Sequence, residues 1–229
     1  MGRLILDGNP PVEVLLRRSS RARRLSLRVS RLDGRATLTL PQGVPEAEGQ
    51  AFLVEREAWL RGHVANVAPE APVRLGGSVP FRGEALPVIG GAVRRARLDP
   101  EGLIVPDDPA RVGARVAAFL KLQARDALSA ASDRYVARLG KSYRKITLRD
   151  TRSRWGSCSS NSDLMYSWRL IMAPPDVLDY VAAHEVAHLQ HMDHSPRFWA
   201  VVEDLFPDHK ACRAWLRRNG DQLHRVRFD

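Results

Sequence analysis

The segment that most constrains this chain is His184-Glu185-Val186-Ala187-His188, in which two histidines stand four residues apart and a glutamate follows the first. Residues four apart in a helix lie on one face, so both imidazoles can reach the same metal ion. Glu185 is rotated by about 100° from His184, which places its carboxylate beside the ion rather than on it. The spacing is typical of a zinc-binding helix that carries its own general base.

The residues before this motif favour a helix. Pro174 and Pro175 suit a first helical turn, and Asp176 and Asp179 suit the positive N-terminal end of the helix dipole. An apolar face then precedes the first histidine and is formed by Val177, Leu178, Val181 and Ala182.

A catalytic zinc ion needs a third protein ligand and an open coordination position for water. His194 follows His188 after five intervening residues, beyond the expected helix end. The run Asp-His-Ser-Pro at 193–196 predicts a turn and the start of a new helix, with the serine as N-cap. We expect this turn to bring His194 to the ion. His191 and Glu203 are the alternative third ligands.

Composition indicates a globular protein of an ordinary kind, because 44% of the residues are hydrophobic and 27% are charged. No run resembles a membrane span, and the N-terminus lacks the apolar segment of a secretory signal. The two cysteines, Cys158 and Cys212, stand singly and far apart. We therefore expect a cytoplasmic protein without a disulfide framework and without a membrane partner.

The net charge of +10 arises from 36 lysines and arginines against 26 acidic residues. Eight arginines and one acidic residue, Asp33, fall within 17–35. Alternating strands are predicted at 25–29 and 36–40, and Asp33-Gly34 between them is a hairpin signal. The result is a small antiparallel sheet edged with arginines. This surface either binds nucleic acid or nucleotides or is simply a solvated strand face.

The overall pattern predicts an α+β fold in two parts. Residues 1–105 read as a β-rich, arginine-rich region with one helix at 45–67, and residues 106–229 as the catalytic domain. The catalytic domain is expected to contain a long helix at 110–139 that ends at Gly140, and strands at 146–150 and 164–171 around a turn-rich segment at 154–161. One strand edge would lie free beside the metal helix, where an extended peptide can pair with it.

Three stretches together resemble the YgjP-like metallopeptidase family, whose more distant relatives are the SprT-like zincins. They are residues 151–159 (Thr-Arg-Ser-Arg-Trp-Gly-Ser-Cys-Ser), residues 168–174 (Trp-Arg-Leu-Ile-Met-Ala-Pro), and the run from Tyr180 through the two-histidine motif to His194-Ser195 and Phe198-Trp199. The resemblance is strongest over 146–205. One departure is Ser167, which stands where the family usually has asparagine and puts substrate contacts at that position in doubt.

The resemblance implies a zincin-like domain in which His184, His188 and His194 hold one Zn²⁺ and Glu185 is the base. It implies cleavage of a protein or peptide substrate, with hydrolysis of nucleoside triphosphates as an alternative. Arg169 and Tyr180 are the candidates for a second group that stabilises the transition state. For both, a purely structural role is the competing interpretation. A third hypothesis is a nucleic-acid-binding module whose zinc is mainly structural.

Overall fold

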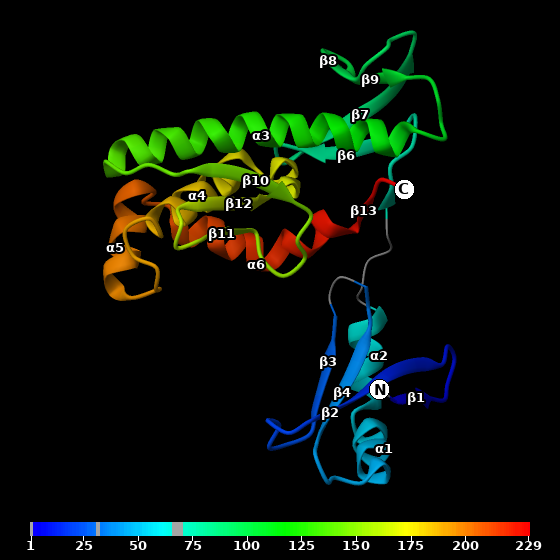
Figure 1. Cartoon of the computed structure of the whole chain (residues 1–229). Helices are drawn as coiled ribbons and strands as arrows, with labels where there is room; N and C mark the ends of the chain where they lie inside the picture. Colours follow the sequence, from blue (N-terminus) through cyan, green and yellow to red (C-terminus); the bar gives the residue numbers. More distant parts are fainter. Residues whose placement is uncertain (1, 31–32, 66–70) are drawn as a thin grey trace. The chain divides into compact units, whose positions relative to one another are not determined.

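The computed structural model describes residues 2–30, 33–65 and 71–229 (Figure 1). The chain forms two compact units, Met1–Pro69 and Glu70–Asp229, and each has a hydrophobic core of its own. Both units mix helices with strands, so the fold is α+β as the sequence predicts. Among the helices in the described ranges, none combines the length and the apolar character needed to cross a membrane.

The first unit is a four-stranded sheet with two helices. Its elements are β1 (Gly2–Leu6), β2 (Val12–Ser19), β3 (Ser26–Val29), β4 (Ala36–Pro41), α1 (Glu46–Glu55) and α2 (Glu57–Ala65). The strand order is β1-β2-β4-β3, and β3 pairs with β4 in the predicted hairpin. The antiparallel pairing predicted for these two strands is confirmed. However, β2 lies parallel to β4, so the complete sheet is mixed. The hairpin inserts β4 between β2 and β3, and β4 then runs in the direction of β2.

Alternation along these strands builds the core of the first unit. Every second residue is buried along β4 and along β2 from Val12 to Leu16, and Leu53 and Leu60 from the two helices pack with them. The single helix predicted at 45–67 is two helices, separated at Arg56. The last two positions of that prediction, Asn66 and Val67, lie outside the described residues.

The second unit contains the remaining elements. They are β5 (Ala71–Pro72), β6 (Ser78–Phe81), β7 (Glu84–Gly91), β8 (Arg97–Asp99), β9 (Gly102–Pro106), α3 (Val112–Leu139), β10 (Lys145–Arg149), β11 (Gly156–Cys158), β12 (Asp163–Ser167), the 3-10 helix η1 (Trp168–Met172), α4 (Pro175–Ala187), α5 (Pro196–Leu205), α6 (His209–Arg225) and β13 (Val226–Arg227). The long helix α3 crosses this unit (Figure 1) and contacts α4, η1 and β9. It ends at Gly140 in a left-handed conformation, as predicted.

The division between the units differs from the boundary expected at residue 105. Strands β6 to β9 do form the predicted β region, in the order β6-β7-β9-β8. Their buried residues, such as Val79, Val88 and Leu103, belong to the same core as α3 and α4. The proline-rich turn at 106–109 therefore connects two parts of one unit, because the core is continuous across it.

A small sheet of three strands, in the order β10-β12-β11, positions the candidate site. β12 lies in the middle, parallel to β10 and antiparallel to β11, which leaves β10 and β11 as the two edges. The strand predicted at 164–171 stops at Ser167 and continues as η1. All five side chains of η1 are buried, whereas a strand at one surface of a sheet alternates between buried and exposed positions.

Candidate metal centre

The helix α4 carries the two histidines of the motif. Pro174 is its N-cap and Pro175 its first residue, where the missing backbone N–H of proline costs no hydrogen bond. Its apolar residues before His184 are buried in the core and fix the orientation of the helix. The helix ends at Ala187, and His188 is its C-cap residue. The second histidine therefore lies where the chain leaves the helix.

The chain returns to this helix end through a short turn. Ser195 caps α5 as predicted, because its hydroxyl oxygen accepts a hydrogen bond from the backbone N–H of Phe198 at 3.5 Å. Pro196 is the first residue of α5. This turn places His194, just before the cap, beside the histidines of α4.

His184, His188 and His194 form a cluster in which one ring nitrogen from each lies within 4.8 Å of the others. The Nε2 atoms of His184 and His194 are 3.2 Å apart. Two ligands bound 2.0–2.1 Å from a tetrahedral zinc ion would be about 3.3 Å apart. The spacing of this pair therefore fits a shared ion without rearrangement.

Neighbouring groups hold the imidazoles in orientations that suit a metal. The carbonyl oxygen of His191 lies 2.9 Å from Nδ1 of His188, an arrangement that puts the proton on Nδ1 and leaves the Nε2 lone pair free. The fully buried Phe198 ring stacks on His188 at 4.4 Å and meets the rings of His184 and His194 edge-on, each at 4.9 Å. One aromatic side chain thus supports all three rings.

Burial, followed by the charges of His188 and His194, lowers the pKa of His184 to about 3. Burial also lowers the pKa of His188, although its hydrogen bond to the His191 carbonyl acts in the opposite direction. Both rings are neutral at pH 7, which is the form that binds a metal ion. The chemistry of the cluster therefore agrees with its geometry.

The alternative third ligands do not join this cluster. His191 contributes its backbone carbonyl to His188, as described above. Glu203 forms an exposed ion pair with Lys210 at 3.5 Å. Among the described residues, it is His194 that lies with the two histidines of the motif.

Glu185 is buried beside the edge strand β11, with 5% of its surface exposed. A Cβ atom added to Gly156 would lie only 2.5 Å from Oε1 of Glu185. Burial raises the pKa of Glu185 to about 8, and the positive charge of Arg154 offsets part of this rise. The carboxyl group therefore occupies space that a glycine leaves open, and a nearby cation favours its charged form.

A cavity of about 440 Å³ opens over the cluster. It is lined by His188, Met192 and His194 and by the segment Ser153, Arg154, Gly156, Ser157 and Cys158. Most of that segment is β11 or the turn before it, so the edge strand borders the histidines. The turn-rich segment predicted at 154–161 thus contains a short strand, and sequence reasoning missed Arg154 and Gly156 as residues of the site. Their signal was the Arg-Trp-Gly-Ser-Cys run itself.

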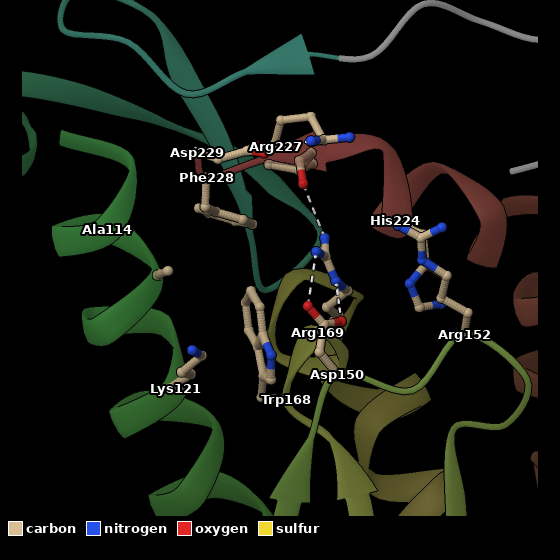
Figure 2. Close-up of a pocket in the computed structure, with 12 residues that line it drawn as sticks. Ala114, Lys121, Asp150, Arg152, Trp168, Arg169, His224, Arg227, Phe228 and Asp229 are labelled. Atoms are coloured by element: carbon tan, nitrogen blue, oxygen red, sulfur yellow. Dashed lines mark hydrogen bonds and ion pairs between the residues drawn. The ribbon is translucent and has the colours of Figure 1, made fainter. Parts of the chain in front are cut away.

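Arg169 lies in a different environment (Figure 2). Its guanidinium group pairs with both carboxylate oxygens of Asp150, at 2.6 and 3.1 Å, and donates to the carbonyl oxygens of Leu223 and Val226 at 2.8 and 3.0 Å. It also lies over the Trp168 ring at 4.9 Å. These contacts connect η1 to the residue that follows β10 and to the C-terminal segment. The structure therefore does not bring Arg169 to the histidine cluster, and it supports the structural interpretation of this residue.

Tyr180 contacts His184 of the cluster but lies outside the cavity over the histidines. Its ring meets His184 edge-on at 6.0 Å and also packs near Phe206 at 6.3 Å, and the side chain is buried. Burial raises the pKa of Tyr180 to about 12, so the phenol is protonated at neutral pH. Ser167, the departure noted in the sequence, is also fully buried, and its N–H donates to the carbonyl of Trp155 at 2.8 Å. Neither residue lines the cavity over the histidines.

The sequence profile of a family described as "YgjP-like, metallopeptidase domain" matches residues 23–219, which is most of the chain. The chain belongs to the YgjP-like family. The matched residues include the histidine cluster, Glu185 and the β11 edge. Membership agrees with the resemblance seen in the sequence and supports a metal-dependent hydrolase.

The chain has no match among curated proteins. Among solved structures, it is similar to the crystal structure of the metallopeptidase zymogen of Pyrococcus abyssi abylysin. The sequences are 20% identical, the TM-score is 0.36, and the similarity covers 39% of this chain and 93% of the abylysin chain. The assignment to the YgjP-like family therefore depends on the profile match.

Proposed function

We propose that this protein is a zinc-dependent peptidase in which His184, His188 and His194 hold the ion and Glu185 is the general base. The observation that carries the proposal is the convergence of three imidazole nitrogens within 4.8 Å at a cavity whose edge strand also contacts the buried carboxyl group of Glu185. Three histidines supply a typical catalytic donor set and leave a coordination position open.

When bound, zinc is a Lewis acid that lowers the pKa of a coordinated water to about 7 and polarises the carbonyl of the scissile bond. Glu185 accepts the proton of the attacking water and then transfers it to the leaving amine. Burial raises the pKa of Glu185, and the positive charge of Arg154 acts in the opposite direction and favours the carboxylate form that accepts the proton. The carbonyl of His191 holds the His188 ring in its ligand orientation.

The edge strand β11 suits an extended peptide. It pairs with β12 on one side only, and it lines the cavity together with His188 and His194. An exposed strand edge offers backbone N–H and C=O groups that a peptide can pair with by strand addition. A peptide aligned on β11 in this way would bring a scissile carbonyl to the histidine cluster.

The test is the variant Glu185→Gln, which keeps the shape of the side chain and removes the base. We expect it to retain zinc in wild-type amount and to lose cleavage of an unfolded protein such as reduced casein. Zinc is measured by metal analysis of the purified chain, and cleavage by electrophoresis. Turnover equal to that of the wild type would overturn the role of Glu185.

The same pair of proteins also tests the alternative substrate. Phosphate release from a nucleoside triphosphate that is lost in Glu185→Gln, with no cleavage of protein by the wild type, would contradict peptidase activity. It would assign the activated water to phosphoanhydride hydrolysis instead.

A further inference from the structure

A second concave region lies at the other edge of the three-stranded sheet. Two cavities of about 450 and 440 Å³ share Lys121, Asp150 and Trp168 in their walls, so they adjoin. One wall is α3 between Ala114 and Arg125, and the facing wall is the end of β10 with the loop that follows it. The C-terminal segment from His224 to Asp229 also lines the larger cavity. We call these two cavities the α3–β10 groove. Because β10 and β11 are opposite edges of the sheet, the groove is separate from the cavity over the histidines.

Four exposed cations line the groove. Lys121 and Arg125 stand one helical turn apart on α3, whereas Arg149 and Arg152 come from the facing wall. Figure 2 shows Lys121 on α3 and Arg152 on the opposite side of Trp168 and Arg169. Within the described part of the chain, none of the four has a carboxylate partner.

The acidic residues of the groove are already paired. Both carboxylate oxygens of Asp150 bind Arg169, and the carboxylate of Asp229 pairs with Arg227. The acidic residues of the groove therefore do not neutralise the four cations Lys121, Arg125, Arg149 and Arg152. Elsewhere on α3 the arrangement differs, because Arg115 pairs with Asp108 and Arg134 with Asp179. Within the described part of α3, Lys121 and Arg125 are the two successive cations that lack such carboxylate partners, and both face the groove.

The floor of the groove is apolar but offers no free ring face. Trp168 is buried, with the Lys121 ammonium 5.4 Å from its ring centre and the Arg169 guanidinium 4.9 Å from it. Leu122, which is 57% exposed, adds an apolar patch at the rim. A ligand would therefore gain its affinity from charge and from contact with Leu122, and stacking on Trp168 would contribute little.

We propose that the α3–β10 groove binds the phosphate backbone of single-stranded nucleic acid, independently of the metal centre. Four cations along two joined cavities match a chain of several phosphates better than one isolated anion. Arginine presents a planar set of donors that fits phosphate oxygens. A single strand can enter a cavity of this size, whereas a duplex presents a broad convex surface. The protein would thereby hold a peptide at one sheet edge and a nucleic acid at the other.

The proposal predicts how strongly the affinity for a single strand depends on salt concentration. Each phosphate neutralised in a single strand contributes a slope of about −0.7 to the dependence of log K on log salt. Four contacts predict that affinity for oligothymidylate falls about 50-fold between 50 and 200 mM salt. Because the contacts are to phosphates, oligoadenylate of the same length should bind with similar affinity.

The experiment is fluorescence anisotropy with labelled oligothymidylate of about 20 nucleotides and the full-length chain. The double variant Lys121→Glu/Arg125→Glu should bind at least about tenfold more weakly, and its loss over the same salt range should shrink to about sevenfold. The matched control is Lys141→Glu/Arg218→Glu, which makes the same charge change at exposed positions outside the groove and should bind close to wild type. A second variant, Arg149→Gln/Arg152→Gln, tests the facing wall.

Several results would overturn the proposal. The groove variant could bind as tightly as its control. Arg17→Glu/Arg28→Glu in the first unit could abolish binding while the groove variant does not. Equal binding of a duplex, or equally effective competition by polyglutamate, would show that the groove does not select a single strand. Thermal melting of each variant confirms folding. Glu185→Gln should bind the oligonucleotide normally, so a failure of the groove and a failure of the peptidase are distinguishable.

Discussion

The α-carbon of Gly156 and the carboxyl group of Glu185 are so close that a methyl group on the glycine would lie 2.5 Å from Oε1 and 2.6 Å from Cγ of the glutamate. The edge strand and the metal helix are thus fitted to each other at the proposed base. Both atoms in conflict belong to a side chain that is 5% exposed, so it has little room to move aside.

Gly156→Ala should therefore displace the carboxyl group of Glu185 without touching a metal ligand. A displacement of about 1 Å at a reacting group can cost about 100-fold in rate, and we expect a loss of that order in kcat/KM. Zinc content should stay at the wild-type level. Kinetics on a fluorogenic peptide and metal analysis measure the two quantities. Ser157→Ala, one residue along the same strand, is the control and should retain most of the activity.

His194→Ala should lower the affinity for zinc by more than about 100-fold, because it removes one of three proposed ligands. Competition with a chromogenic chelator measures this affinity. His191→Ala is the matched control, since the structure uses the backbone carbonyl of that residue and the substitution leaves it in place. Equal affinities in the two variants would contradict the assignment of His194.

Arg169→Ala should destabilise the second unit by about 3 kcal/mol or more. It would leave Asp150 without its bidentate partner and two carbonyl oxygens without their donor, in a position where the arginine side chain is only 10% exposed. Urea unfolding measures the free energy. Arg144→Ala, which breaks the exposed pair with Asp163, is the control and should change the free energy of unfolding far less, because solvent screens an exposed ion pair. A loss of activity in Arg169→Ala with unchanged stability would favour a catalytic role after all.

The thiol of Cys158, which lines the cavity, should react slowly with alkylating reagents at neutral pH. Burial, followed by the charges of Glu185 and Asp163, raises its pKa to about 11. A raised pKa keeps the thiol protonated, so only about one molecule in a thousand carries the thiolate at pH 8. The rate of alkylation by iodoacetamide, followed by peptide mass spectrometry, should rise about tenfold for each pH unit until the pH approaches that value. Rapid modification of Cys158 at pH 7 would contradict a raised pKa of this thiol.

Sequence alone was sufficient for the parts of the site that depend on local rules. The prolines at the start of α4, the four-residue spacing of the two histidines and the Ser195 cap are each decided within one or two helical turns. The position of His194 follows from the same cap, because the residue before an N-cap lies at the junction of two segments.

Other features depend on residues far apart in the chain, so the sequence alone did not reveal them. The parallel pairing of β2 with β4 depends on where the β3–β4 hairpin docks. Arg169 is held by Asp150 and by carbonyls of residues 223 and 226, none of which is near it in sequence. Gly156 is recognisable as part of the site only once β11 is seen to lie against Glu185.

The end of α4 at His188 has a consequence for how the proposed ion would be held. Five residues separate this histidine from His194, and closing so short a loop restricts the unfolded chain far less than joining distant segments would. Most of the ordering that brings the three imidazoles together is therefore supplied by folding of the helices. Binding of the proposed ion would therefore mainly stabilise the junction between α4 and α5, which the fold has already formed.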